Sequence, residues 1–433
     1  MANLIINGGK KLSGTITPSG NKNSVLPLLC ASLLTDEEVT IKNVPELTDV
    51  KLLVESLKSV GSKVEWNQKT SSIKINNSKT SRSFFKNDFP LGMRGSILLF
   101  APLLHRMKKL VIKNKIGGCT LGIREIDPHL EILRRFGAKI KNGGQISMEI
   151  KDRFKAADVW LDYMSVTTTE NFIMAAVLAK GKSKITNAAS EPHVQDLCRF
   201  LNQSGAKISG IGTSTLEIEG VKKLKGTSFK VGSDHHEIAT LLALGAMTGG
   251  KVTVKEVPLD HFPLIISSFA KLGVEIKAEG NSLVVKEKQD LKVKPTYTKN
   301  VLQKIEGAPW PYFPVDLLPL MVALATKAKG TIMFWNKVYE GGFFWVPEMI
   351  KFGAHIVVSD PHRIIVFGNN PMKPAEVDAP DVIRATVALA MAALAIKGES
   401  TIKNADPILR AHPNFTYKIK SLGADIRWEA EQD

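Results

Sequence analysis

Apolar and polar positions along this 433-residue chain follow a pattern that recurs six times. Each copy contains apolar residues at helical spacing, such as Val194, Leu197 and Leu201, and then a short glycine motif, as in QSGAKI and KFGAHI. Successive motif glycines are 68 to 80 residues apart: Gly61, Gly137, Gly205, Gly273, Gly353 and Gly423. Self-similarity at a steady period predicts a chain built from six repeats of about 70 residues.

Each copy predicts a helix that ends at its glycine and then strands. A proline ahead of each glycine suits the first helical turn, where no N–H is needed: Pro45, Pro128, Pro192, Pro263, Pro347 and Pro413. The glycine is expected to end the helix with a positive φ. Two strands follow, as in ISMEI and RIIVF, but the sixth copy is expected to lack its second strand because the chain ends there.

A second motif lies between the copies. It predicts a strand in segments such as EEVTIKNV and GESTIKNA, and a long apolar helix precedes it, as in residues 385–396. Each repeat therefore has two helices and several strands. Three repeats on each side of a midpoint near residue 232 predict two similar α/β domains, since 433 residues exceed what a single core usually supports.

The composition favours a protein of the reducing cytoplasm. The apolar stretch before Gly8 is too short and too broken for a signal peptide, and residues 385–396 are too few to span a bilayer, so no membrane insertion is expected. The three cysteines form no CxxC pair, which argues against a disulfide framework and a zinc site. Cys30 and Cys198 lie in apolar stretches that are typical of a core.

The net charge of +16 leaves three interpretations open. The charges form a solvated surface, they bind nucleic acid through phosphates, or they draw anionic substrates into a positive cleft. The lysines are dispersed, and aromatic residues make up only 7% of the chain. Both observations weaken the nucleic-acid interpretation, because single-strand binders need aromatic stacking platforms.

Several predicted helix starts carry polar or basic residues. Lys22 and Asn23 lie at one, Arg94 at another, and Asp381 and Arg384 at a third. Helix N-termini bind anions through free N–H groups and a partial positive charge. Each signal alone fits a solvated charge as well, but together they indicate a positive cavity of an enzyme or an anion binder.

Cys119 differs from the other two cysteines because it follows two glycines in a basic loop, KIGGCTLGIREIDPH. Lys115 and Arg124 should favour its thiolate form. An unimportant loop cysteine is one reading. The other is a thiol on a closing loop that donates a proton or acts as a nucleophile. No His–Asp partner lies beside it in the sequence, so papain-type hydrolysis is not indicated.

Two aspartates are candidates for polar roles. Asp316 follows a proline-rich segment directly before a long apolar helix, where it suits a helix N-cap or a general base. Asp234 lies at the chain midpoint and suits a hinge ion pair or a substrate contact. The nine histidines show no HExxH pattern, and the chain has neither a Walker loop nor a GxGxxG after a strand. We therefore predict no metal and no cofactor.

The sixfold repeat, SGNKNSVLPLLCASLL, GGCTLGIREIDPH and FPVDLLP resemble the enolpyruvyltransferases along essentially the whole chain, and most closely the branch that acts on UDP-N-acetylglucosamine. The resemblance implies an α/β fold of two inside-out barrel domains, each of three repeats, with the active site in the cleft between them. Residues 22–232 would form the domain that carries Cys119, and residues 1–21 with 233–433 would form the other.

The resemblance also implies residue roles in the transfer of enolpyruvyl from phosphoenolpyruvate to a sugar 3-hydroxyl. Asp316 would be the base. Cys119 would be the proton donor and the site of a covalent phosphoenolpyruvate adduct, and fosfomycin is expected to alkylate it. The phosphate and carboxylate of phosphoenolpyruvate would be held by Lys22, Arg94, Arg124 and Arg410. The sugar nucleotide would contact Asn23, Asp127, His129, Ser165, Val166, Asp234, Val338, Asp381 and Arg384.

The chain departs from the family pattern mainly on the side expected to face the nucleotide. The family usually has Lys where this chain has Tyr163, Gly where it has Thr167, Glu where it has His193, and Arg where it has His235 and Gly342. The segment Asp381–Arg384 is one residue longer than the family's Asp-Leu-Arg. The expected partners are phosphoenolpyruvate and UDP-N-acetylglucosamine, and not nucleic acid. Two alternatives remain, a related transferase with another sugar-nucleotide acceptor and a phosphate- or RNA-end-binding protein.

Overall fold

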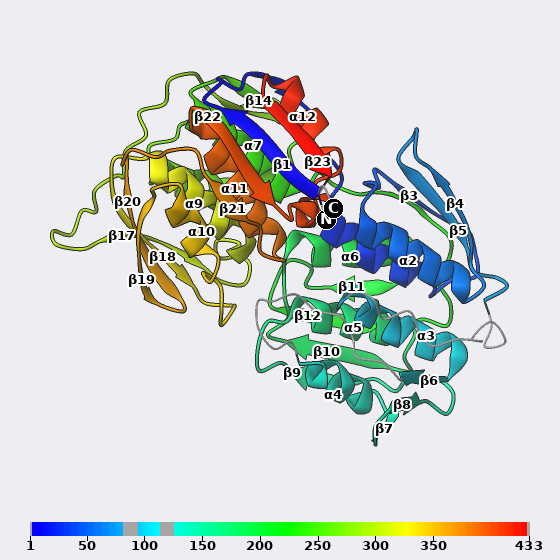
Figure 1. The fold of residues 1–433 in the computed structure, drawn as a ribbon. Helices are drawn as coiled ribbons and strands as arrows, with labels where there is room; N and C mark the ends of the chain where they lie inside the picture. The colour runs from blue at the N-terminus through cyan, green and yellow to red at the C-terminus, as the bar shows by residue number, and fades with distance from the viewer. Residues whose placement is uncertain (1, 81–93, 113–124, 431–433) are drawn as a thin grey trace. The chain divides into compact units, whose positions relative to one another are not determined.

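The computed structural model describes residues 2–80, 94–112 and 125–430, which form two compact units. Unit 1 contains residues 2–19 and 233–430, and unit 2 contains the described residues from 20 to 232. The chain passes from one unit to the other after Ser19 and again after Gly232. Figure 1 shows the elements of both units.

Unit 2 is built from six α-helices, a 3₁₀ turn and three sheets among its described residues. The helical elements are α1 (Lys22–Ser32), α2 (Thr48–Ser59), η2 (Arg94–Leu99), α3 (Phe100–Met107), α4 (Asp127–Arg135), α5 (Val166–Ala176) and α6 (Pro192–Gln203). The strands are β3 (Val39–Lys42), β4 (Lys63–Asn67), β5 (Ser72–Asn76), β6 (Lys109–Ile112), β7 (Lys139–Asn142), β8 (Ile146–Glu149), β9 (Asp158–Trp160), β10 (Lys182–Thr186), β11 (Lys207–Ser209), β12 (Thr215–Glu219) and β13 (Ser228–Lys230).

Unit 1 has the same kinds of element. The helical elements are α7 (His235–Thr248), η3 (Leu259–His261), α8 (Pro263–Ala270), η4 (Val315–Leu317), α9 (Leu318–Lys327), α10 (Val346–Lys351), α11 (Ile383–Ala395), η5 (Asp406–Arg410) and α12 (Phe415–Ser421). The strands are β1 (Ala2–Gly8), β2 (Gly14–Ile16), β14 (Val252–Val254), β15 (Ile276–Glu279), β16 (Ser282–Val285), β17 (Gln303–Gly307), β18 (Gly330–Asn336), β19 (His355–Asp360), β20 (Arg363–Gly368), β21 (Glu376–Asp378), β22 (Gly398–Lys403) and β23 (Asp425–Ala430).

The six sheets share one strand order, which confirms the predicted repeat. One example is the order β11-β12-β10-β9. Here β11, which follows the repeat glycine, pairs antiparallel with the next strand, β12, and β12 pairs antiparallel with β10, the strand of the second motif. A fourth strand then pairs in parallel, as β9 does with β10. The other four-stranded sheets are β4-β5-β3-β13, β15-β16-β14-β2, β19-β20-β18-β17 and β23-β1-β22-β21, and β7-β8-β6 shows three strands within the described residues.

The repeat glycines end their helices as expected. All six have positive φ, between 81° and 102°. The expectation for the prolines was right at four positions, where proline lies in the first turn of α4, α6, α8 or α10. It was wrong for Pro45 and Pro413, because α2 begins only at Thr48 and α12 only at Phe415.

The sixth repeat was expected to lack its second strand, and no strand follows β23 among the described residues. The missing strand is β1, which lies between β22 and β23 and is antiparallel to both. The register pairs Leu4 with Ile402 on one side and with Trp428 on the other. The first strand of the chain therefore completes the last sheet.

Buried helices form the centre of each unit. Helices α7, α9 and α11 of unit 1 contact one another and bury residues on all sides. In unit 2, α1 packs on α6, and α3 packs on α5. Strands alternate between buried and exposed side chains, as β10 does, so one face of each sheet covers the helices and the other faces solvent. Among the described residues, no helix combines the length and the apolar character that a membrane span requires.

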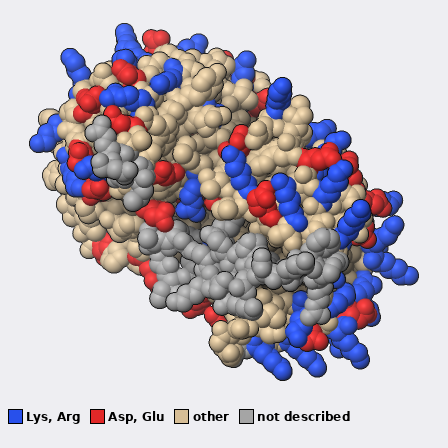
Figure 2. All heavy atoms as spheres, turned by 45° about the vertical axis from the view of Figure 1, so that its right-hand side comes forward, with Lys and Arg blue, Asp and Glu red and all other residues tan. Residues whose placement is uncertain are grey.

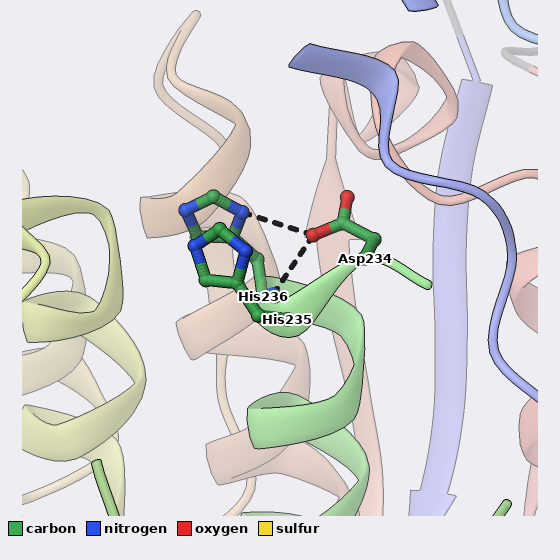
Figure 3. A group of neighbouring side chains, drawn as sticks. All are labelled: Asp234, His235 and His236. Atoms are coloured by element: carbon green, nitrogen blue, oxygen red, sulfur yellow. Dashed lines mark hydrogen bonds and ion pairs between the residues drawn. The ribbon is translucent and has the colours of Figure 1, made fainter. Parts of the chain in front are cut away.

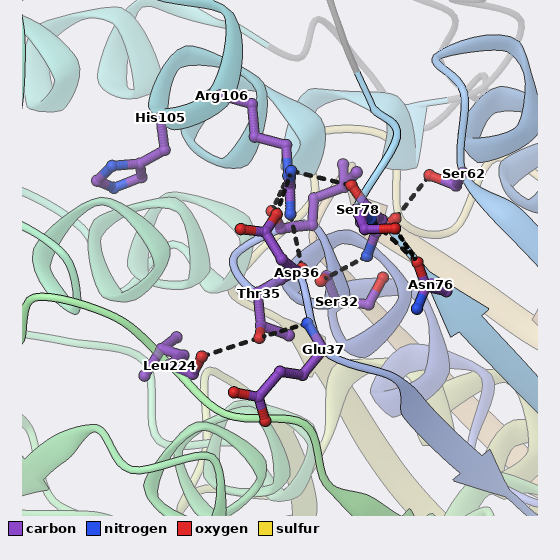
Figure 4. Close-up of polar contacts among 12 residues, drawn as sticks. Ser32, Thr35, Asp36, Glu37, Ser62, Asn76, Ser78, His105, Arg106 and Leu224 are labelled. Atoms are coloured by element: carbon purple, nitrogen blue, oxygen red, sulfur yellow. Dashed lines mark hydrogen bonds and ion pairs between the residues drawn. The ribbon is translucent and has the colours of Figure 1, made fainter.

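Two half-buried arginines tie the ends of inner helices to neighbouring strands in unit 2. Arg106 of α3 donates to the carbonyl oxygens of Leu33, Thr35 and Asn77 and to Asp36 Oδ1 (Figure 4). Leu33 and Thr35 lie just beyond the C-terminus of α1, where helix carbonyls lack partners. Arginine also matches the negative end of the helix dipole there.

Arg153 repeats this arrangement at α5. Its guanidinium donates to the carbonyl oxygens of Leu178, Ala179 and Val221. Leu178 and Ala179 follow the C-terminus of α5, just as Leu33 and Thr35 follow that of α1. The two arginines therefore satisfy equivalent carbonyl groups in two repeats.

Candidate functional site

The start of α1 holds Lys22 and Asn23 as predicted. Asn21 is the N-cap, and its side-chain oxygen accepts a hydrogen bond from the Asn23 N–H at 2.8 Å. Lys22 is buried, and its Nζ lies 2.5 Å from Asp49 Oδ2 of α2. A lysine at a helix N-terminus is unfavourable for the dipole, and the buried Asp49 offsets this charge.

Arg94 opens the 3₁₀ turn η2 that leads into α3. Its Nη2 donates to the carbonyl oxygen of Glu125 at 2.6 Å, directly before α4. Cys119 and Arg124 lie outside the described residues. Their predicted roles are therefore untested by the structure, whereas Lys22 and Arg94 are both cations of unit 2.

His129 is buried beneath the start of α5. Its Nδ1 accepts from Asn171 Nδ2 at 3.0 Å, so Nε2 carries the proton and faces Thr167 Oγ1 at 3.3 Å and Thr168 Oγ1 at 3.4 Å. Burial, and then the charge of Arg94, lower the pKa of His129 to about 3. Asn171 Nδ2 also donates to the carbonyl oxygen of Ile97 in η2. The neutral ring thus connects α4, α5 and η2.

The predicted nucleotide segment forms the beginning of α5. Ser165 is the N-cap of α5, Val166 is its first residue, and Ser165 Oγ lies 2.7 Å from Thr168 Oγ1. Tyr163 precedes them with 48% of its side chain exposed, and burial and Glu191 raise its pKa. Free N–H groups at this helix start can bind an anionic group. Asp127, the first residue of α4, is exposed.

In unit 1, Asp316 lies in η4 immediately before α9. The N-cap reading was wrong, because Leu317 occupies that position and Asp316 makes no cap hydrogen bond. Its Oδ2 instead lies 3.9 Å from His236 Nε2 and 4.0 Å from Arg384 Nε. The side chain is 33% exposed, so a reacting group can reach it.

Asp234 is the N-cap of α7 and is fully enclosed. Its Oδ1 accepts from the His236 N–H at 2.8 Å and from His236 Nδ1 at 2.9 Å (Figure 3). Burial alone would raise the pKa of Asp234, but His236, Arg384 and His235 together hold it well below the usual range. The carboxylate is therefore ionised and fixes one orientation of the His236 ring.

The remaining predicted residues of unit 1 lie near α11. Arg384 is the second residue of α11, and its Nη1 donates to His412 Nε2 at 3.1 Å. Burial, and then Arg384, lower the pKa of His412 to about 3, so this ring is neutral. Arg410 ends η5, 3.5 Å from Asp381 Oδ1, and is partly exposed. Val338, half-buried, follows β18 and donates its N–H to Asn336 Oδ1 at 3.0 Å.

One group of side chains could in principle share a metal ion. Within the described residues, Asp234, His235 and His236 are the sole His, Cys, Asp or Glu group whose donor atoms all lie within 4.8 Å of one another. Asp234 Oδ1 and His236 Nδ1 already form a hydrogen bond, and Arg384 adds positive charge beside them. We therefore assign no metal to this group.

Sequence reasoning missed three residues of these clusters: Asp49, His236 and His412. Asp49 pairs with Lys22 across two helices, His236 joins Asp234 to Asp316, and His412 holds Arg384. Each of these residues contacts a predicted site residue, and most of the contacts join positions that are far apart in the sequence. The position of His236 two residues after Asp234 in GSDHHE was the one local signal available.

Basic side chains are not gathered in one block on the visible surface. Figure 2 shows Lys and Arg spread over the face in view, with Asp and Glu among many of them. Pairs such as Lys182 with Glu217 and Lys207 with Glu219 are surface ion pairs of this kind. Much of the positive charge is therefore a solvated surface.

A family model described as EPSP synthase (3-phosphoshikimate 1-carboxyvinyltransferase) matches residues 6–419. This chain belongs to the EPSP synthase family. The match spans nearly all of both units and includes five of the six repeat glycines, while Gly423 lies just beyond it.

Two relatives in the family are both named UDP-N-acetylglucosamine 1-carboxyvinyltransferase. The protein of Borrelia garinii subsp. bavariensis is 40% identical over 428 residues, which cover 99% of each chain. The protein of Treponema denticola is 40% identical over 427 residues, which cover 98% of this chain and 99% of the relative.

The fold is shared with a solved enolpyruvyl transferase. The enolpyruvyl transferase NikO from Streptomyces tendae superimposes with a TM-score of 0.86 over 100% of this chain and 99% of its own, at 20% identity. The predicted fold class, two inside-out α/β barrel domains, is thereby confirmed.

Proposed function

We propose that this protein transfers the enolpyruvyl group of phosphoenolpyruvate to the 3-hydroxyl of UDP-N-acetylglucosamine and releases phosphate. The observation that carries this proposal is the full-length similarity, at about 40% identity, to relatives that bear the name of this activity. The similarity to solved EPSP synthases is 17% to 18% and supports only the fold.

The chemistry of the substrates fits the charged residues of both units. Phosphoenolpyruvate carries a phosphate and a carboxylate, and Lys22, Arg94, Arg124 and Arg410 would neutralise them. Asp316 would accept the proton of the acceptor hydroxyl as its oxygen bonds to C2, and Cys119 would protonate C3. Phosphate then leaves. Fixed cations and dipoles stabilise the charge that develops, and losing one such contact typically costs about 3 kcal/mol of barrier.

The sugar nucleotide would use polar groups at helix starts. Ser165 and Val166 would bind the diphosphate at the N-terminus of α5, where N–H groups are free. Asn23 would contact the sugar, and His129 would hold the α5 start in place from below. Further contacts are proposed for Asp127, Asp234, Val338, Asp381 and Arg384.

A related transferase with another sugar-nucleotide acceptor is the second candidate. It is favoured by Tyr163 and Thr167 at the start of α5, which differ from the usual Lys and Gly at the segment proposed to face the nucleotide. Phosphate release from phosphoenolpyruvate should be measured with a panel of nucleotide sugars. Turnover with UDP-N-acetylglucosamine supports the first candidate, and turnover only with another acceptor supports the second. No turnover, with salt-sensitive nucleic-acid binding, would refute both.

Arg124 offers a direct test of the phosphoenolpyruvate assignment. Arg124→Ala should raise the KM for phosphoenolpyruvate and lower kcat, because a cation is removed from a multiply charged anion. Steady-state kinetics at varied phosphoenolpyruvate would measure both constants. Unchanged kinetics would reject the role of Arg124.

The proposed reaction places the protein in the cytoplasm, at the first committed step of peptidoglycan synthesis and thus in cell-wall growth, cell shape and division. Fosfomycin, an epoxide, is expected to alkylate Cys119 in the presence of the sugar nucleotide. Peptide mass spectrometry would detect the adduct. An unmodified Cys119 peptide after incubation with the drug would count against the proposed role of this thiol.

A further inference from the structure

His236 is oriented by a buried carboxylate at the start of α7. Asp234 Oδ1 accepts both the backbone N–H of His236 and its ring Nδ1, at 2.8 and 2.9 Å (Figure 3). Since Asp234 is an ionised acceptor, Nδ1 must carry the proton. When the ring is neutral, Nε2 presents a lone pair, and only 5% of the side chain is exposed.

The Nε2 atom faces Asp316, which is the proposed base. The distance from Nε2 to Asp316 Oδ2 is 3.9 Å, which is longer than a hydrogen bond. A single water or a small side-chain movement closes such a gap. Asp234, His236 and Asp316 thus form a line of carboxylate, imidazole and carboxylate.

The surroundings of His236 are compatible with an imidazolium. The ring lies between Asp234 and Asp316, and both carboxylates would stabilise a positive charge on it. Two groups oppose this effect, since Arg384 lies 4.0 Å from Asp316 and the His235 ring lies 4.0 Å from that of His236. Burial, and then the charge of Arg384, lower the pKa of His412 to about 3, so this neighbouring ring is neutral.

We propose that His236 is a positioning residue for Asp316 that also takes over its proton. Asp316 first removes the proton of the acceptor hydroxyl, whose oxygen bonds to C2 of phosphoenolpyruvate. The proton then passes from Asp316 to His236 Nε2, the imidazolium is held by Asp234, and Asp316 is ionised again. The proton later leaves to solvent. This inference rests on the proposed function, because it takes Asp316 as the base.

Two substitutions separate the nitrogens of His236. His236→Asn keeps a donor close to the Nδ1 position for Asp234 and removes Nε2. His236→Gln places an amide near the Nε2 position, which can hydrogen bond to Asp316 but cannot accept a proton. Both variants should lower kcat about 10- to 100-fold, below the full effect of a direct general base. The KM for phosphoenolpyruvate should change less than about threefold, because these atoms do not bind it.

The pH profile tests proton transfer itself. In the wild type, kcat should fall at acid pH because protonated His236 cannot accept a proton, and this limb should move to lower pH in His236→Asn. Thermal unfolding of each variant checks that the fold is retained. His355→Asn is a matched control, because this histidine is exposed on β19 and should leave kcat and the profile unchanged.

A double-mutant cycle with Asp316→Asn tests whether His236 acts through Asp316. In the Asp316→Asn background, His236→Asn should lower kcat no further. If the two residues acted independently, their fold-losses in kcat would multiply. Wild-type kcat and an unmoved acid limb in both His236 variants would overturn the inference. So would full activity of His236→Gln together with loss in His236→Asn, since that pattern indicates a hydrogen bond without proton transfer.

Failure of the His236 inference can be distinguished from failure of the proposed function. The wild type is assayed first over the acceptor panel, and failure with UDP-N-acetylglucosamine refutes the proposed function alone. The His236 variants are then compared with the wild type on whichever acceptor supports turnover. Turnover with no acceptor would refute both.

Discussion

Arg106 offers the sharpest test of how unit 2 is held together. Its guanidinium donates to three carbonyl oxygens and one carboxylate, and only 14% of the side chain is exposed. Arg106→Met keeps most of the aliphatic volume of the side chain and removes all four hydrogen bonds of the guanidinium. The carbonyls of Leu33, Thr35 and Asn77 then lose this partner at the point where α1 ends.

The expected cost follows from these contacts. Hydrogen bonds to a charged group contribute about 1.5 to 3 kcal/mol each, and a buried carbonyl without a partner costs about 1 to 3 kcal/mol. Water entry through the partly open edge reduces the sum, so Arg106→Met should lower the free energy of unfolding by about 3 to 5 kcal/mol. Arg106→Lys keeps the charge but only one branch of the fork, and should lose about half as much.

Chemical denaturation gives the global loss, and hydrogen exchange of peptides 22–36 and 100–112 gives the local one. Exchange should rise first in these peptides, because they contain the carbonyls that Arg106 holds together and the helix that carries it. Arg153→Met should have a similar effect at α5. Arg134→Met is the control, since this exposed arginine pairs with Glu131 on the surface and its replacement should cost under about 1 kcal/mol.

A loss below about 1 kcal/mol in Arg106→Met, with unchanged exchange in both peptides, would refute the reasoning. It would mean that water replaces the guanidinium at these carbonyls without penalty. An equal loss in Arg106→Met and Arg134→Met would refute it as well, because burial would then not matter.

Two further predictions concern stability. Gly342→Arg, which restores the usual family residue, should lower the melting temperature, because a Cβ at Gly342 would overlap the side-chain amide of Asn336, and an unchanged melting temperature would contradict this packing. Burial is the main cause that lowers the pKa of His105 to about 4 and those of His129 and His412 to about 3, so the unfolded chain binds more protons than the folded one below pH 6.5. The contribution of these histidines to stability should therefore be fully present above pH 6.5, and the free energy of unfolding should fall toward pH 4 by about 1.4 kcal/mol per pH unit for each histidine. Urea unfolding at several pH values measures this dependence. In His129→Asn, the slope of unfolding free energy against pH should be smaller by the amount that corresponds to one proton.

Much of the fold could be predicted because its signals are local. The repeat glycines require positive φ, which few other residues adopt, and apolar periodicity marks the helices before them. The pairing of β1 with β22 and β23 could not be predicted, since the partners lie about 390 to 430 positions away in sequence. Nothing in the β1 sequence indicates which two strands it pairs with.

The site was predictable in its residue types more than in its contacts. Lys22 and Arg384 were chosen because they lie at helix starts, and the structure places them there. Their partners Asp49 and His412 depend on how helices pack, which one sequence does not reveal. Asp316 was expected either to cap a helix or to act as a base, and its contact with His236 required the position of α7.

The insertion of β1 into the last sheet has a consequence for biosynthesis. As the chain leaves the ribosome, residues 20–232 emerge as one continuous stretch and can fold at once. The segment that carries β1 has been made by then, but β22 and β23 are translated only after residues 20–232 and most of unit 1. Strand β1 must therefore remain without its partner strands during most of translation. Deleting β1 would leave a gap between β22 and β23, which lie far from it in the sequence.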